Sequence, residues 1–186
     1  MSTTLPPSAE QAVAATRNWV DKAVIGLNLC PFAKAVQVKQ LIRYVASPAT
    51  SPEQLAEELA RELLLLQAAA PEEIDTTLLI HPGVLTDFYD YNDFLRLADD
   101  ILIDLGLEGE LQIASFHPDY QFADAAPDAI ENHTNRSPYP TLHLLRESSL
   151  DAAVAAFPDA ADIFEKNIET LRRLGPAGWK ALKLDK

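Results

Sequence analysis

Apolar residues recur with a helical period in several segments of the chain. The clearest segment places Leu55, Leu59 and Leu63 on one face, because residues four positions apart meet on the same side of a helix. Two segments begin with a serine, Ser8 or Ser51, followed three residues later by glutamine, which is the spacing of a helix-starting capping box. The pattern predicts five helices: one beginning near Ala9, three covering about 52–70, 91–105 and 150–156, and one from after Asp159 to Gly175.

Short apolar or alternating runs between these helices predict four strands, at 41–46, 76–80, 111–116 and 141–146. The first three alternate with helices, which favours parallel pairing through right-handed crossovers. The fourth follows a long loop without a clear helix, so we expect it to run antiparallel to the third. The sequence therefore predicts an α/β fold with a mixed, mostly parallel sheet of about four strands covered by helices.

The length and composition fit one globular domain over residues 1–186, with 1–7 as a disordered lead and 176–186 as a C-terminal tail. Hydrophobic residues make up 48% of the chain, which is enough for a core, but no apolar run is long enough to span a bilayer. The first residues lack the pattern of a signal peptide. The single cysteine, Cys30, rules out an intramolecular disulfide. We expect a cytoplasmic protein without a membrane partner.

Charge is unevenly distributed along the chain, whose net charge is −13. Between Asp87 and Glu131 there are twelve acidic residues and one basic residue, Arg96. A surface of this kind repels phosphate backbones, so we expect no nucleic-acid partner. The acidity itself has two interpretations: it keeps the protein soluble, or it forms a docking face for a basic protein or a cation.

Polar residues cluster where the predicted strands end. His81 and His117 each follow a strand and precede a proline, and parallel strands would bring both to the carboxyl edge of the sheet, where α/β folds bind ligands. An antiparallel fourth strand would bring Asn135, Arg136 and His143 to the same edge. We predict that His117 acts as an acid–base group and that Arg136 holds an anionic group bidentately. Asn135, His81 and His143 would complete the binding site.

Each of these residues also has a structural interpretation. Histidines at strand ends bond backbone groups in turns, and His143 alternates with leucines as a half-buried sheet residue does. Arg136 would pin the loop through hydrogen bonds to carbonyl groups or to a loop carboxylate. The loop at 117–140 is unusually long for a compact domain, and we expect it to be ordered and packed through Tyr120, Phe122 and Tyr139.

Cys30 precedes Pro31, which would make it the cap of a short helix and lower the pKa of its thiol, as a nucleophile requires. The alternative is a buried, inert thiol beside Phe32. A histidine-based metal site is a further alternative, although no two histidines have the local spacing of metal ligands. The chain has no phosphate-binding loop, dinucleotide fingerprint or nucleophile elbow, so no cofactor is expected.

Three runs together resemble an uncharacterised bacterial family, domain of unknown function 1415. They are VIGLNLCPFA at 24–33, SFHP at 115–118 and NHTNRSPYP at 132–140, the last of which continues into TLHLLRE. The resemblance covers nearly the whole chain and implies a stand-alone bacterial protein of about this length. It implies no reaction and no catalytic residues.

Two classes of function follow from these residues. One is a small-molecule enzyme or ligand-binding protein that recognises an anionic group at the carboxyl edge of the sheet. The other is a non-catalytic interaction module that uses its acidic face. A single concave pocket around Cys30, His117 and Arg136 would favour the first, whereas a rim held in backbone hydrogen bonds would favour the second.

Overall fold

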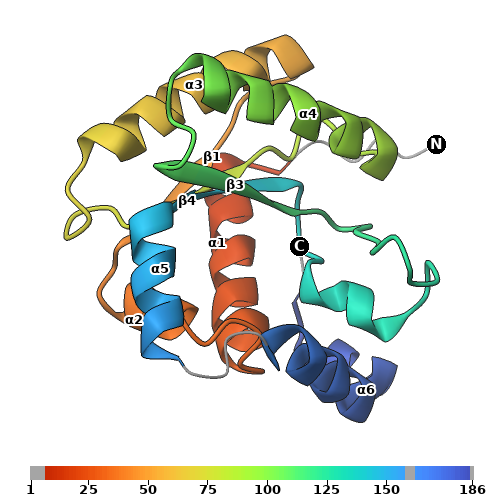
Figure 1. Cartoon of the computed structure of the whole chain (residues 1–186). Helices are drawn as coiled ribbons and strands as arrows, with labels where there is room; N and C mark the ends of the chain where they lie inside the picture. Colours follow the sequence, from red (N-terminus) through yellow and green to blue (C-terminus); the bar gives the residue numbers. More distant parts are fainter. Residues whose placement is uncertain (1–6, 158–161, 185–186) are drawn as a thin grey trace.

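A four-stranded sheet forms the centre of the protein in the computed structural model, which describes residues 7–157 and 162–184 (Figure 1). The strands are β1 (Ile42–Ala46), β2 (Thr76–Ile80), β3 (Leu111–Phe116) and β4 (Thr141–Arg146). Their order across the sheet is β1-β2-β4-β3. Only β1 and β2 pair in parallel, and β4 is antiparallel to both of its neighbours.

The expected mostly parallel sheet is therefore wrong, although the mixed α/β fold is confirmed. The predicted antiparallel return of β4 is also correct, but β4 inserts between β2 and β3 instead of adding to the outer side of β3. β2 and β3 still run in the same direction, since each is antiparallel to β4. Because Thr141 pairs with both Ile80 and Phe116, β4 begins at the edge where β2 and β3 end.

Helices cover both faces of the sheet (Figure 1). On one face α3 (Pro52–Ala68) and α4 (Phe88–Asp104) bury their leucine and aromatic side chains against Leu79, Leu142 and Leu144. On the other face α1 (Ala9–Trp19) and the π-helical turn η1 (Val20–Ile25) pack against Leu78 and Phe116. The remaining elements are α2 (Ala33–Val38), a 3-10 helix η2 (Ile130–Thr134), α5 (Glu147–Ala156) and α6 (Ile163–Ala181).

The predicted helix starts are confirmed where the chain is described. Ser8 forms a complete capping box with Gln11. Ser51 accepts a hydrogen bond from the Gln54 amide, but the Gln54 side chain bonds Thr50 instead of returning to Ser51. The start expected after Asp159 falls partly on residues 158–161, and most of the expected lead is 1–6; both stretches lie outside the described residues.

Figure 1 places α6 beside η2, away from the two helices α3 and α4. The predicted stop at Gly175 is a kink inside α6, where the glycine has φ 66° and ψ 174°, values that favour glycine. Among the described residues, no helix is both long enough and apolar enough to cross a lipid bilayer.

Tyr91 of α4 ties this helix to the point where β3 ends and β4 begins. Its side chain is fully buried, and its hydroxyl donates to the carbonyl oxygen of Thr141 at 2.8 Å. The same hydroxyl oxygen accepts from the amide of Phe116 at 3.2 Å. One phenol therefore satisfies backbone groups of both strands at the Phe116–Thr141 pair, where the sheet ladder ends.

Replacing this hydroxyl tests its structural weight. Tyr91→Phe should lower the free energy of unfolding by about 1–3 kcal/mol, because a buried donor and a buried acceptor lose their partner. Urea denaturation measures the change. The matched control is Tyr89→Phe on the same helix, where the side chain is 75% exposed and should show almost no effect. Equal unfolding midpoints for the two variants would contradict the assignment.

Candidate functional site

His81 and His117 lie at the same edge of the sheet, as the strand pattern predicts, on the strands that flank β4. Both side chains are fully buried and pack on Tyr91, with ring centroids 5.7 Å and 5.1 Å from its ring. Their backbone amides bond the far end of the long loop. His81 donates to the carbonyl of Pro140 and His117 to the carbonyl of Asn135. The edge is therefore closed over by the loop at 117–140.

The hydrogen bonds of these two rings define their tautomers. His81 Nδ1 lies 3.0 Å from the carbonyl oxygen of Val84, so this nitrogen carries the proton. His117 Nε2 donates to Leu85 at 3.2 Å, while its Nδ1 accepts from the Asp119 amide at 3.0 Å. Burial lowers the pKa of His81 to about 4 and also lowers the pKa of His117. Both rings are neutral near pH 7.

These bonds bear on the predicted roles without testing them. Both nitrogens of His117 are occupied by backbone groups, so an acid–base role would require the turn at Asp119 to open. His81 keeps Nε2 without a partner in the described structure, but the ring is sealed from solvent. The geometry favours a structural role for both histidines, and their catalytic and binding roles stay predictions.

His143 does not reach the edge, contrary to expectation. It pairs with Leu78 and Ala114 in the interior of the sheet, because β4 already begins at Thr141. Its Nε2 lies 2.7 Å from the hydroxyl of Thr76, which itself donates to the carbonyl of Leu144. Nε2 must therefore be the donor. Burial lowers the pKa of His143 to about 4.

The loop between β3 and β4 packs through the aromatic residues that were expected to anchor it. Tyr120 contacts Phe88 and Phe122, Phe122 contacts Phe164, and Tyr139 is buried beside α1. The side chain of Asn132, which is fully buried, bonds backbone groups at both ends of the turn between Phe122 and Pro127. The loop is a packed layer over the edge of the sheet.

Arg136 is held by this loop. Its Nε donates to the carbonyl of Tyr120 at 3.0 Å and its Nη2 to the carbonyl of Pro127 at 2.8 Å. This is the carbonyl-pinning arrangement considered above, and it uses one edge of the guanidinium. Within the described residues, no printed hydrogen bond or ion pair uses Nη1. Asn135, the other predicted binding residue, accepts from the His117 amide and lies with its side chain near Ser115.

Arg136 lines a hollow of about 300 Å³ at the carboxyl edge of the sheet, which we call the Arg136 hollow. Other residues lining it are Trp19, Asp119, His133, Ser137 and Trp179. It thus combines a guanidinium, a carboxylate, an imidazole and both tryptophans of the chain. Asp119 is exposed, and its charge raises the pKa of Arg136 against the larger lowering caused by burial.

His133 is the residue of this hollow that the strand-end argument misses. Its Nδ1 donates to the carbonyl of Ile130 at 3.1 Å, which leaves Nε2 as the ring nitrogen able to accept. The ring lies edge-on to Trp179 with centroids 4.5 Å apart. Burial, followed by the charge of Arg136, lowers the pKa of His133. Its position beside Asn135 and Arg136 in the sequence is the signal that points to it.

Cys30 lies in a different part of the molecule. Its neighbour Phe32 contacts Phe157, and the carbonyl of Leu29 accepts from Asn167 of α6. The expected helix cap is wrong, because α2 begins at Ala33 with Phe32 as its cap. Burial raises the pKa of the thiol despite hydrogen bonds from two backbone amides. No printed contact of the described residues joins Cys30 to a histidine, and its role as a nucleophile remains a prediction.

Within residues 7–157 and 162–184, no group of three His, Cys, Asp or Glu side chains has the arrangement of a metal site. The structure thus offers no specific support for the histidine-based metal alternative in that part of the chain. The same stretch does not bring Cys30, His117 and Arg136 around one pocket.

The thiol environment predicts slow alkylation of Cys30. Because its pKa is raised, the thiolate fraction near pH 7 is smaller than in an exposed cysteine, and the alkylation rate should rise as the pH increases. The rate with iodoacetamide, followed by mass spectrometry, should be at least about tenfold below that of glutathione. A rate faster than glutathione at neutral pH would instead support an activated nucleophile.

Comparison with known proteins gives one match. A family model described as a protein of unknown function, domain of unknown function 1415, matches residues 11–181. No curated protein and no solved structure matches the chain. The family model covers most of the sequence, including the sheet and the loop that carries Arg136. The chain therefore belongs to the family of domain of unknown function 1415.

Proposed function

We propose that the protein binds a small organic acid with a flat apolar body in the Arg136 hollow. The observation that carries this proposal is the fixed guanidinium of Arg136. Two backbone carbonyls hold one of its edges, and the group lies in a hollow that also contains both tryptophans. A guanidinium whose orientation is already fixed binds a carboxylate with less loss of entropy than a free side chain does.

The surroundings of Arg136 favour an anionic ligand. The guanidinium is partly buried, and burial lowers its pKa, so an additional negative charge would be bound favourably. Asp119 supplies part of this charge but is itself exposed and forms no printed ion pair with Arg136. The indole of Trp179 offers an apolar wall on which a flat ligand would pack.

His133 adds a proton-dependent contact to the proposed site. The ring is neutral near pH 7, because its pKa is lowered, and its Nε2 has no hydrogen to donate. A bound carboxylate would stabilise the protonated ring and raise the pKa of His133. Proton uptake then accompanies binding, so affinity should increase as the pH falls from neutral toward the pKa of the bound state.

The second candidate function is a non-catalytic interaction module. One observation favours it: His117 is bound to backbone groups on both nitrogens, as expected of a rim that performs no chemistry. The exposed carboxylates of α4, among them Asp93, Asp99 and Asp100, would then contact a basic protein. Small-ligand binding and this function share a non-catalytic edge but predict different partners.

Tryptophan fluorescence tests the proposed ligand, since both tryptophans line the Arg136 hollow. Titration with benzoate should change the emission in a saturable way. Arg136→Lys should weaken binding by about 1–3 kcal/mol, because lysine cannot reproduce the planar pair of donors. The matched control is Arg96→Lys, an exposed residue of α4, which should bind benzoate like the unchanged protein.

Arg136→Ala provides a separate measure of the structural role. It should lower the unfolding midpoint, because the carbonyls of Tyr120 and Pro127 lose their donors. If Arg136→Lys keeps full benzoate affinity while Arg136→Ala loses stability, Arg136 is a scaffold residue and the proposed function is wrong.

A further inference from the structure

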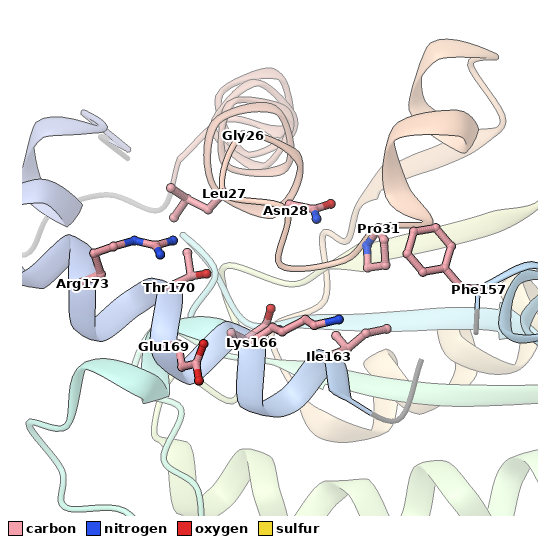
Figure 2. Close-up of a pocket in the computed structure, with 11 residues that line it drawn as sticks. Gly26, Leu27, Asn28, Pro31, Phe157, Ile163, Lys166, Glu169, Thr170 and Arg173 are labelled. Atoms are coloured by element: carbon pink, nitrogen blue, oxygen red, sulfur yellow. The ribbon is translucent and has the colours of Figure 1, made fainter. Parts of the chain in front are cut away.

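A second and larger hollow lies along α6, on the side of the molecule that carries Cys30. We call it the α6 hollow; it has a volume of about 540 Å³ and lies between α6 and the turn that follows η1 (Figure 2). The helix and the turn are joined by Asn167, a buried residue whose side chain donates to the carbonyl of Leu29 at 2.9 Å. This bond fixes the width of the hollow from within the protein.

Three polar side chains of α6 face the turn from one stripe of the helix. Lys166, Thr170 and Arg173 follow at intervals of four and three residues, which places them on the same side of a helix. Seven residues correspond to a rise of about 10 Å, so the two cationic side chains begin about that far apart. Figure 2 shows Lys166 extending toward the Pro31 end and Arg173 lying beside Leu27 and Thr170.

The charge of this hollow contrasts with the rest of the protein. The chain carries a net charge of −13, yet two cations line the α6 hollow and Glu169 is the one carboxylate among its described lining residues. In Figure 2 the Glu169 side chain points away from Asn28, on the opposite side of α6. Among the described residues, Arg172 pairs with Glu131 at 2.8 Å, whereas Arg173 takes part in no printed ion pair.

The two ends of the hollow differ in polarity. Arg173, Thr170 and the amide side chain of Asn28 provide hydrogen-bond donors toward one end. Pro31, Ile163 and Phe157 form an apolar wall at the other end, and Phe157 is held in place by its edge-on contact with Phe32. A hollow of this volume is in the range that accommodates small organic ligands.

We infer that the α6 hollow binds an organic phosphate whose phosphate group lies between Arg173 and Thr170 and whose apolar body reaches Pro31 and Phe157. A phosphate accepts hydrogen bonds from several directions, which suits a guanidinium, a hydroxyl and an amide arranged around it. Lys166 contributes positive charge along the path of the ligand. This site is separate from the Arg136 hollow and shares no lining residue with it.

Amide chemical shifts of the full-length, 15N-labelled protein test the inference, with phenyl phosphate as the probe. Saturable shifts are expected at Asn28 and Thr170. Arg173→Gln should weaken this binding at least about tenfold, since it removes a charged hydrogen-bond donor. Arg172→Gln is the matched control: it removes the same charge from the adjacent position, whose side chain pairs with Glu131, and should change affinity less than about twofold.

Further arms separate this inference from the alternatives. Phenol should produce no saturable shifts at Asn28 and Thr170, and inorganic phosphate should bind more weakly than phenyl phosphate, because each probe lacks one half of the ligand. Arg136→Lys should leave the affinity for phenyl phosphate at these two residues unchanged, so failure of the proposed organic-acid site would not affect the result. The inference is overturned if phenyl phosphate leaves Asn28 and Thr170 unshifted, or if Arg172→Gln weakens binding as much as Arg173→Gln does.

Discussion

The hydroxyl of Tyr91 is the contact on which the arrangement of the carboxyl edge depends. It joins α4 to Phe116 and Thr141, the last pair of the β3–β4 ladder, and its ring separates His81 from His117. The two histidines in turn bond the loop at 117–140 through their backbone amides. The edge therefore consists of a buried aromatic cluster with the loop fixed over it.

This cluster determines where a ligand can be recognised. The imidazoles of His81 and His117 are consumed by backbone hydrogen bonds or sealed from solvent, so they support the loop from below. The loop then presents Arg136 and His133 on its outer side, beside Trp179. In physical terms, the inner layer supplies rigidity and the outer layer supplies the accessible polar groups.

The sequence predicts the bounds of β2, β3 and β4 because each is a short apolar or alternating run between clear breaks. It predicts the direction of β4 but not its place between β2 and β3, since neighbour order depends on which edge the returning strand meets. For the same reason His143 was expected at the edge and lies inside the sheet. The strand-end residues His81 and His117 were placed correctly, because strand direction alone decides which edge they reach.

Both hollows were beyond the reach of sequence patterns. Arg173 and Thr170 occupy the polar side of an amphipathic helix, which normally faces solvent, and only the long-range bond from Asn167 to Leu29 brings that side against the turn after η1. His133 lies in a 3-10 helix that has too few residues to leave a periodic signal. The pinning of Arg136 was foreseen as an alternative, but its carbonyl partners depend on how the loop folds.

The central claim is that the edge histidines are neutral structural groups and that His133 keeps an accepting nitrogen in the Arg136 hollow. Long-range 1H–15N NMR spectra of the histidine side chains test it directly, since the chain has four histidines. Near pH 7 the account predicts a proton on Nδ1 of His81 and His133 and on Nε2 of His117 and His143. A charged imidazolium at His81 or His117, or the opposite tautomer at either, would contradict it.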